Sequence, residues 1–142
     1  MAANDSAFKI LVDAHPEQFV QRFLPGAQYL QSLSVGLPIS DPLRADALLH
    51  YQRGEEQAIL HLEVQTASDK EMPERLCLYN QLIWRREHLP VHSLVLYLEK
   101  TSTPTSPWQL QGPDGTILTF HYRVFKLWEE SVEDWLASGM VG

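Results

Sequence analysis

The sequence contains little cysteine, no long apolar run and no internal repeat. Its one cysteine, Cys77, excludes an internal disulfide framework and a cysteine-rich zinc site, and it fits a reducing cytoplasm. No apolar run approaches the ~18 residues that a membrane span needs, so no membrane partner is expected. The N-terminal MAANDSAFK lacks the basic and apolar regions of a signal peptide. Together these absences predict one cytoplasmic domain over residues 1–142.

Positive charge is also scarce. The chain has 11 Lys and Arg against 18 Asp and Glu, a formal net charge of −7. This balance excludes a protein that coats nucleic acid through bulk charge, because DNA affinity depends on neutralising phosphates. A local basic groove is still compatible with it, and so is a divalent cation that offsets clustered carboxylates.

The spacing of apolar residues predicts a mixed α/β architecture. Helical periodicity over residues 6–24 is interrupted at His15-Pro16, since proline disfavours a helical residue before it and suits the first turn of a new helix. Further helices are expected at 69–88 and 131–138. Strands are expected at 44–52, 57–66, 91–98 and 116–125. Residues 27–42 give no clear prediction.

The helix expected at 69–88 has a candidate cap, a tolerated proline and an apolar stripe. Asp69 is the expected cap, and Pro73 is tolerated in a first turn. An apolar stripe along one side predicts the face that packs on the sheet. Its members are Met72, Leu76, Tyr79 and Ile83.

The stretch ILHLEVQT, residues 59–66, raises a chemical question. In a strand Glu63 and Gln65 share one face, whereas Leu62 and Val64 point to the other. If the preceding turn is centred between residues 54 and 55, Asp46 lies opposite Glu63. Two opposed carboxylates repel each other, and a divalent cation between them reverses the sign of that effect. The alternative is an ordinary solvated face of an antiparallel sheet.

The pattern of Asp46, Glu63 and Gln65 resembles the PD-(D/E)XK nuclease superfamily, in which glutamine replaces the final lysine in some branches. Further segments extend the resemblance over nearly the whole chain, to the Rpn (YhgA-like) family of recombination-promoting nucleases and transposases. They are DSAFKILVDAHPEQFVQRFLP, RADALLHY, ILHLEVQT, MPERLCLYN, PVHSLVLYL and VFKLWEES. The resemblance implies a restriction-endonuclease-like PD-(D/E)XK core, a mixed β-sheet flanked by helices.

The resemblance also implies a metal-dependent DNA endonuclease that hydrolyses phosphodiester bonds. Asp46 and Glu63 would bind Mg²⁺ or Mn²⁺ together with the backbone carbonyl of Val64, and the metal would activate water. Gln65 would take the lysine position and orient water by a hydrogen bond, without supplying a charge.

The missing lysine charge at Gln65 and the net charge of −7 also support an alternative function. In that alternative the chain is a catalytically weak or inactive module that acts in protein interaction or DNA binding. Relatives often continue past the terminal LASGMVG, so the resemblance implies a short or C-terminally truncated member. Whether such a chain works as a monomer or a homodimer is open.

Several residues are candidates for support of the site from the helices. Many superfamily members use an acid from the first helix, and Asp5 is preferred here over Asp13 and Glu17. Lys9 could line a DNA groove, although scattered basic residues are usually solvated.

Arg75 and Tyr79 share a face of the helix expected at 69–88. Arg75 could bond a phosphate, hold Glu63, or form a surface pair with Glu71. Tyr79 could contact the site or simply pack in the core. His61 shares the face of Glu63, where it is either a third ligand, a proton shuttle or a half-buried packing residue.

Overall fold

The computed structural model describes residues 3–36 and 45–130, with the side chains of residues 3–5 left out. The helix expected at 131–138 lies outside these ranges. The helices are α1 (Ala3–Ala14), α2 (Pro16–Phe23), α3 (Met72–Glu87) and the 3₁₀ turn η1 (Leu127–Glu129). The strands are β1 (Gln28–Ser32), β2 (Ala47–Arg53), β3 (Glu56–Gln65), β4 (Val91–Tyr97), β5 (Trp108–Gly112), β6 (Gly115–Phe120) and β7 (Arg123–Lys126).

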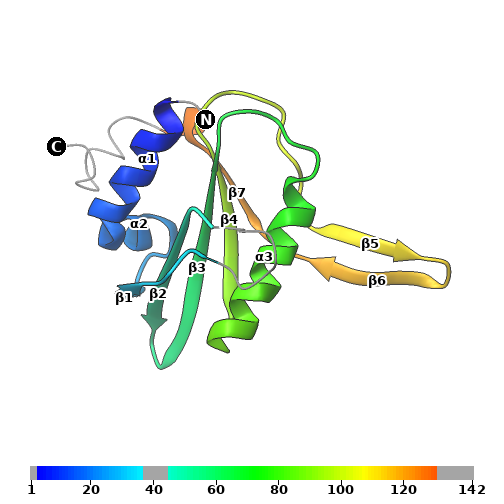
Figure 1. Ribbon diagram of the computed structural model, residues 1–142, viewed down its shortest axis with the longest axis horizontal. Coiled ribbons are helices and arrows are strands. Elements are labelled where there is room, and N and C mark those ends of the chain that lie inside the picture. Colours follow the sequence, from blue (N-terminus) through cyan, green and yellow to red (C-terminus); the bar gives the residue numbers. More distant parts are fainter. Residues whose placement is uncertain (1–2, 37–44, 131–142) are drawn as a thin grey trace.

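Five of the strands form one mixed sheet in the order β1-β2-β3-β4-β7. The β1–β2 and β2–β3 pairs are antiparallel, whereas β3–β4 and β4–β7 are parallel. Helices α1 and α2 cover one face of the sheet and α3 covers the other (Figure 1). The expected mixed α/β architecture, a mixed sheet flanked by helices, is therefore confirmed. Within the described ranges, no helix is long and apolar enough to cross a bilayer.

The β2–β3 hairpin has the register that the sequence predicts. Ala47 pairs with Leu62 and Leu48 pairs with His61, which places the next pair of positions at Asp46 and Glu63. Strand alternation then separates two environments on β3. The even-numbered residues Leu60, Leu62 and Val64 lie on the α1–α2 side and are buried. The odd-numbered residues face α3.

The α3 helix begins later than expected. Glu71, not Asp69, occupies the N-cap position and makes no side-chain cap bond. Asp69 instead accepts a hydrogen bond at Oδ1 from the backbone N–H of Glu71, at 2.9 Å, and so closes the turn before the helix. The apolar stripe from Met72 to Ile83 is buried, as predicted.

One strand prediction was wrong. The single strand expected at 116–125 is divided into β6 and β7, which belong to different sheets. The break falls at Tyr122, whose N–H donates to Ser106 Oγ and whose hydroxyl donates to the carbonyl of Thr105. These bonds to the preceding loop take the backbone out of the ladder, and no glycine or proline marks the break in the sequence. Strand β5 pairs with β6 in a hairpin that extends away from the main sheet (Figure 1).

Candidate functional site

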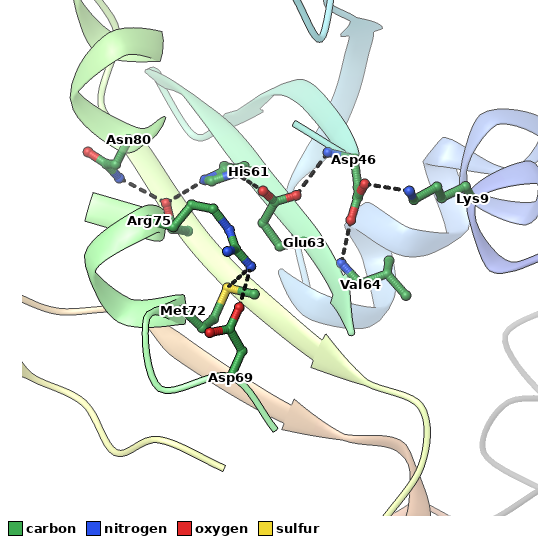
Figure 2. A network of polar contacts seen from close by, with 10 residues as sticks. Lys9, Asp46, His61, Glu63, Val64, Asp69, Met72, Arg75 and Asn80 are labelled. Carbon is green, nitrogen blue, oxygen red and sulfur yellow. Dashed lines mark hydrogen bonds and ion pairs between the residues drawn. The ribbon is translucent and has the colours of Figure 1, made fainter. Parts of the chain in front are cut away.

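Asp46 and Glu63 meet where the β2–β3 ladder ends. The backbone N–H of Asp46 donates to Glu63 Oε2 at 2.9 Å, and the backbone N–H of Val64 donates to Asp46 Oδ2 at 2.7 Å (Figure 2). Each carboxylate therefore binds a backbone N–H at or beside the other acid. This exchange replaces the next step of strand pairing and fixes both side chains at one edge of the hairpin.

Val64 presents its backbone to the same place. The parallel ladder uses the backbone groups of odd-numbered β3 residues, since Ile59 N–H donates to the carbonyl of Pro90 and Leu98 N–H donates to that of Gln65. Successive peptide groups alternate in direction, so the N–H and carbonyl of Val64 both point toward the β2 side. The Val64 carbonyl thus faces the side on which Asp46 lies, which is compatible with its predicted role as a ligand.

Lys9 reaches the site from α1. Its Nζ lies 2.8 Å from Asp46 Oδ1, and the two side chains are 26% and 17% exposed (Figure 2). Lys9 is therefore in direct contact with one of the two candidate ligands. Because Asp46 Oδ2 already accepts from Val64, both oxygens of this carboxylate have protein partners.

His61 is completely buried, with 0% exposure, so the expectation of a half-buried packing residue was wrong. Its Nε2 lies 3.7 Å from Glu63 Oε1 and has no hydrogen-bond partner, whereas its Nδ1 lies 2.8 Å from Ser93 Oγ. Asn80 of α3 donates to Ser93 Oγ at 3.1 Å. Glu63 is only 5% exposed and therefore sits at the end of a buried polar chain.

The electrostatics of the pair are unfavourable for two full charges. Burial raises the pKa of Asp46, and the nearby Glu63 carboxylate raises it further, while Lys9 and the Val64 N–H act in the opposite direction. The pKa of Tyr79 is raised, chiefly by burial and next by the Glu63 carboxylate. The nearby Arg75 charge offsets only part of this rise. A cation between the carboxylates would offset this repulsion.

Other predicted residues lie in different surroundings. Gln65 is the half-buried last residue of β3, and Tyr79 is buried in α3 with its ring 6.0 Å from that of His61. Arg75 pairs with Asp69 at 2.9 Å rather than with Glu63 or Glu71. Asp69 is within reach because it lies in the turn before α3 and not at the N-cap of the helix. Asp5 belongs to α1, but its side chain is outside the described part. Asp13 and Glu17 are exposed.

The donor set fits a hard cation held by few protein groups. Among the described residues no three His, Cys, Asp or Glu side chains are arranged to hold a metal ion. Asp46, Glu63 and the Val64 carbonyl supply oxygen ligands, and Mg²⁺ commonly takes one or two carboxylates and keeps several waters. Lys9 is the charge that such a cation would displace from Asp46.

The sequence interpretation missed the chain formed by Ser93 and Asn80. A signal for it was present, since Ser93 interrupts the apolar run of β4 and Asn80 follows Tyr79 on the buried side of α3. Two buried polar residues on facing elements generally need each other as hydrogen-bond partners. Periodicity alone could not identify which groups would be joined.

No protein-family model, curated protein or solved structure matches this chain.

Proposed function

We propose that the protein is a metal-dependent DNA endonuclease of the PD-(D/E)XK type, similar to the Rpn family, that hydrolyses phosphodiester bonds. The observation that carries the proposal is the meeting of Asp46 and Glu63 at the end of the hairpin, linked by a 2.9 Å hydrogen bond. A fold gains no stability from two neighbouring, largely buried carboxylates unless a cation or a proton offsets their charge.

The order of elements supports the same proposal. A helical pair precedes three antiparallel strands, a helix and a parallel strand. Asp46 lies directly before β2, and Glu63 lies on the neighbouring strand β3. This arrangement is compatible with the α/β core that the resemblance implies.

Each residue has a role that its position allows. Asp46 and Glu63 would hold Mg²⁺ or Mn²⁺ with the Val64 carbonyl. When bound, the cation supplies stabilisation of the charge on the scissile phosphate and activates water. Gln65, two residues beyond Glu63 on the same strand face, would orient that water through its amide.

A catalytically weak or inactive module is the second candidate. It is favoured by Lys9, whose amine already neutralises Asp46 at 2.8 Å, and by glutamine in the place of a lysine at position 65. In this function the Lys9–Asp46 pair is structural, and the surface binds protein or DNA without cleaving it.

Metal binding and DNA nicking, measured on the same samples, distinguish the two. We would titrate Mg²⁺ and Mn²⁺ by calorimetry into the wild type, Asp46→Asn and Glu63→Gln, with Asp69→Asn as the matched control. Asp69 is a carboxylate that pairs with Arg75 outside the proposed ligand set. The endonuclease proposal expects binding and plasmid nicking in the wild type and in Asp69→Asn, with both lost in the other two variants.

A wild type that binds no cation at millimolar concentration, even with DNA present, would overturn the endonuclease proposal. Cation binding that is unchanged in both Asp46→Asn and Glu63→Gln would overturn it as well. Cation binding without nicking would favour the inactive module.

A further inference from the structure

The buried polar chain beside Glu63 has a direction that can be worked out from its hydrogen bonds. It runs from the carbonyl of Val91 through Asn80, Ser93 and His61 to Glu63 (Figure 2 shows the part from Asn80 onward). Each member of such a chain has a limited number of donors and acceptors. Fixing the role of one member therefore fixes the role of the next.

The orientation of the Asn80 amide is fixed first. Its Nδ2 lies 2.8 Å from the carbonyl oxygen of Val91, which only accepts hydrogen bonds, so this atom must be the donating nitrogen. The Asn80 oxygen accepts from Gln81 Nε2 at 3.2 Å. The second hydrogen of the same Nδ2 is directed at Ser93 Oγ, at 3.1 Å.

The role of the Ser93 hydroxyl then determines which nitrogen of His61 carries the proton. Its Oγ accepts from Asn80, and its own hydroxyl hydrogen needs an acceptor in a site that is 3% exposed. His61 Nδ1 lies 2.8 Å away. If Nδ1 accepts that hydrogen, every polar group up to this point is satisfied, and the neutral imidazole carries its proton on Nε2.

The Nε2–H then points toward the candidate site. Nε2 is buried and has no partner, and Glu63 Oε1 lies 3.7 Å from it, somewhat beyond hydrogen-bond reach. A buried donor without a hydrogen-bond partner is unfavourable, so a small rotation of the Glu63 carboxylate toward it is favoured. With the opposite tautomer, the Nε2 lone pair would instead face the carboxylate.

We propose that His61 is a positioning residue that, as the Nε2–H tautomer held by Asn80 and Ser93, donates to Glu63 Oε1 and sets the orientation of that carboxylate. Oε2 is meanwhile held by the Asp46 N–H, so Glu63 is fixed at both oxygens. The consequence for cation binding rests on the proposed function, whereas the tautomer and the contact with Glu63 do not. Hydrogen bonds to ligating carboxylates typically change metal affinity 10- to 100-fold.

The direct test is the tautomer of His61 in the full wild-type chain. Long-range ¹H–¹⁵N correlation spectra at about pH 8, where an ordinary histidine is neutral, distinguish a protonated Nε2 from a protonated Nδ1. The His61→Gln variant assigns the signals among the six histidines of the chain. We expect protonated Nε2 and bare Nδ1. A His61 that is protonated on Nδ1 would overturn the proposal.

A pair of variants at Ser93 tests the chain itself. Ser93→Ala removes the hydroxyl, so the Nε2–H preference should be lost and Mg²⁺ affinity should fall about tenfold. Ser93→Thr keeps the hydroxyl, so the Nε2–H preference and the Mg²⁺ affinity should both stay as in the wild type. Ser32→Ala, on strand β1, is the matched control and should change neither. An unchanged tautomer in Ser93→Ala would overturn the directional chain.

The wild-type spectrum needs no variant to fold, so the test stands even if Ser93→Ala is unstable. It also separates the two proposals. If the Nε2–H tautomer is found but the wild type binds no cation, the proposed function fails and the role of His61 in orienting Glu63 stands. If cations bind but Nδ1 carries the proton, only the positioning role fails.

Discussion

The two faces of strand β3 are both buried, but one is apolar and the other carries polar side chains. On the α1–α2 side, Leu60 and Leu62 are packed in a cluster made only of apolar side chains. On the α3 side, His61 and Glu63 are similarly buried but are polar. Hydrogen bonds from Asn80 of α3 and Ser93 of β4 reach His61, and Glu63 accepts one from the Asp46 N–H. Neighbouring residues of one strand thus have similar burial and entirely different partners.

The contrast between the two faces of β3 distinguishes residues that stabilise the fold from residues that are available for binding or chemistry. Apolar burial stabilises without specific geometry, whereas each buried polar group must find a partner or cost free energy. A protein selected only for stability would gain by making both faces apolar. We infer that the α1–α2 side mainly stabilises the domain, and that the polar residues on the α3 side are kept for what they bind.

The largest expected effect on stability comes from the apolar face. Leu62→Ala should lower the free energy of unfolding by about 2–5 kcal/mol, because it leaves a cavity at a fully buried position. Cation affinity of the folded protein should be unchanged. Urea denaturation measures the first quantity and calorimetry the second. Ile117→Ala, at a position 68% exposed, is the control and should stay within about 0.5 kcal/mol of wild type.

The comparison of the two faces predicts that Asp46→Asn, unlike Leu62→Ala, lowers cation affinity without lowering stability. Removing one of two repelling charges should leave the apo protein at least as stable as the wild type at neutral pH, while cation affinity falls at least tenfold. Urea denaturation and Mg²⁺ titration test the two halves. A loss of several kcal/mol in stability with no change in cation binding would show that the carboxylate is structural.

Lys9→Gln should act in the other direction on binding. The Lys9–Asp46 pair is partly exposed, and such pairs contribute about 0.2–1 kcal/mol, so removing the competing ammonium should tighten Mg²⁺ binding up to about fivefold. Lys70→Gln, an exposed lysine, is the control and should leave the affinity unchanged. Weaker binding in Lys9→Gln would contradict the view that Lys9 occupies the position of the cation.

The smallest effects are the pH dependences of two carboxylates, which should have opposite signs. The pKa of Asp46 is raised from 3.8, chiefly by burial, so its contribution to stability is present at low pH and is lost as pH rises through the raised pKa. The pKa of Asp69 is lowered from 3.8, first by the hydrogen bond from the Glu71 N–H, so its contribution is present above pH 3.8 and is lost as pH falls through the lowered pKa.

Urea denaturation between about pH 3 and pH 7, the range that brackets ordinary carboxyl pKa values, measures both signs. Relative to Asp46→Asn, the wild type should lose stability as pH rises. Relative to Asp69→Asn, it should gain stability. Equal signs for the two variants would contradict the assigned environments.

Local pattern predicted the parts of the fold that are specified locally. The α1–α2 break at Pro16, the β2–β3 register and the buried stripe of α3 all follow from short-range rules and are confirmed. Strand β1 was not predicted because its residues are mostly exposed and show no alternation. The break between β6 and β7 was not predicted because it depends on bonds from Tyr122 to a loop about 16 residues earlier.

Part of the candidate site also follows from short-range rules, and part of it does not. The meeting of Asp46 with Glu63 follows from hairpin register alone. The partner of Arg75 depends on where α3 begins, and the partner of His61 depends on which residue of β4 lies beside it across the parallel ladder. Those contacts are set by tertiary packing, for which one sequence gives no periodic signal.

The most direct test of the central claim is to locate a bound cation in solution. Amide spectra of the ¹⁵N-labelled wild type would be recorded during sub-stoichiometric addition of Mn²⁺, whose paramagnetism broadens nearby signals. We expect the amide signals of Asp46, Glu63 and Val64 to lose intensity first, and Asp46→Asn to abolish this loss. Broadening that begins instead at exposed acids such as Glu55 in the hairpin turn and Glu56 at the start of β3 would contradict a cation site at Asp46 and Glu63.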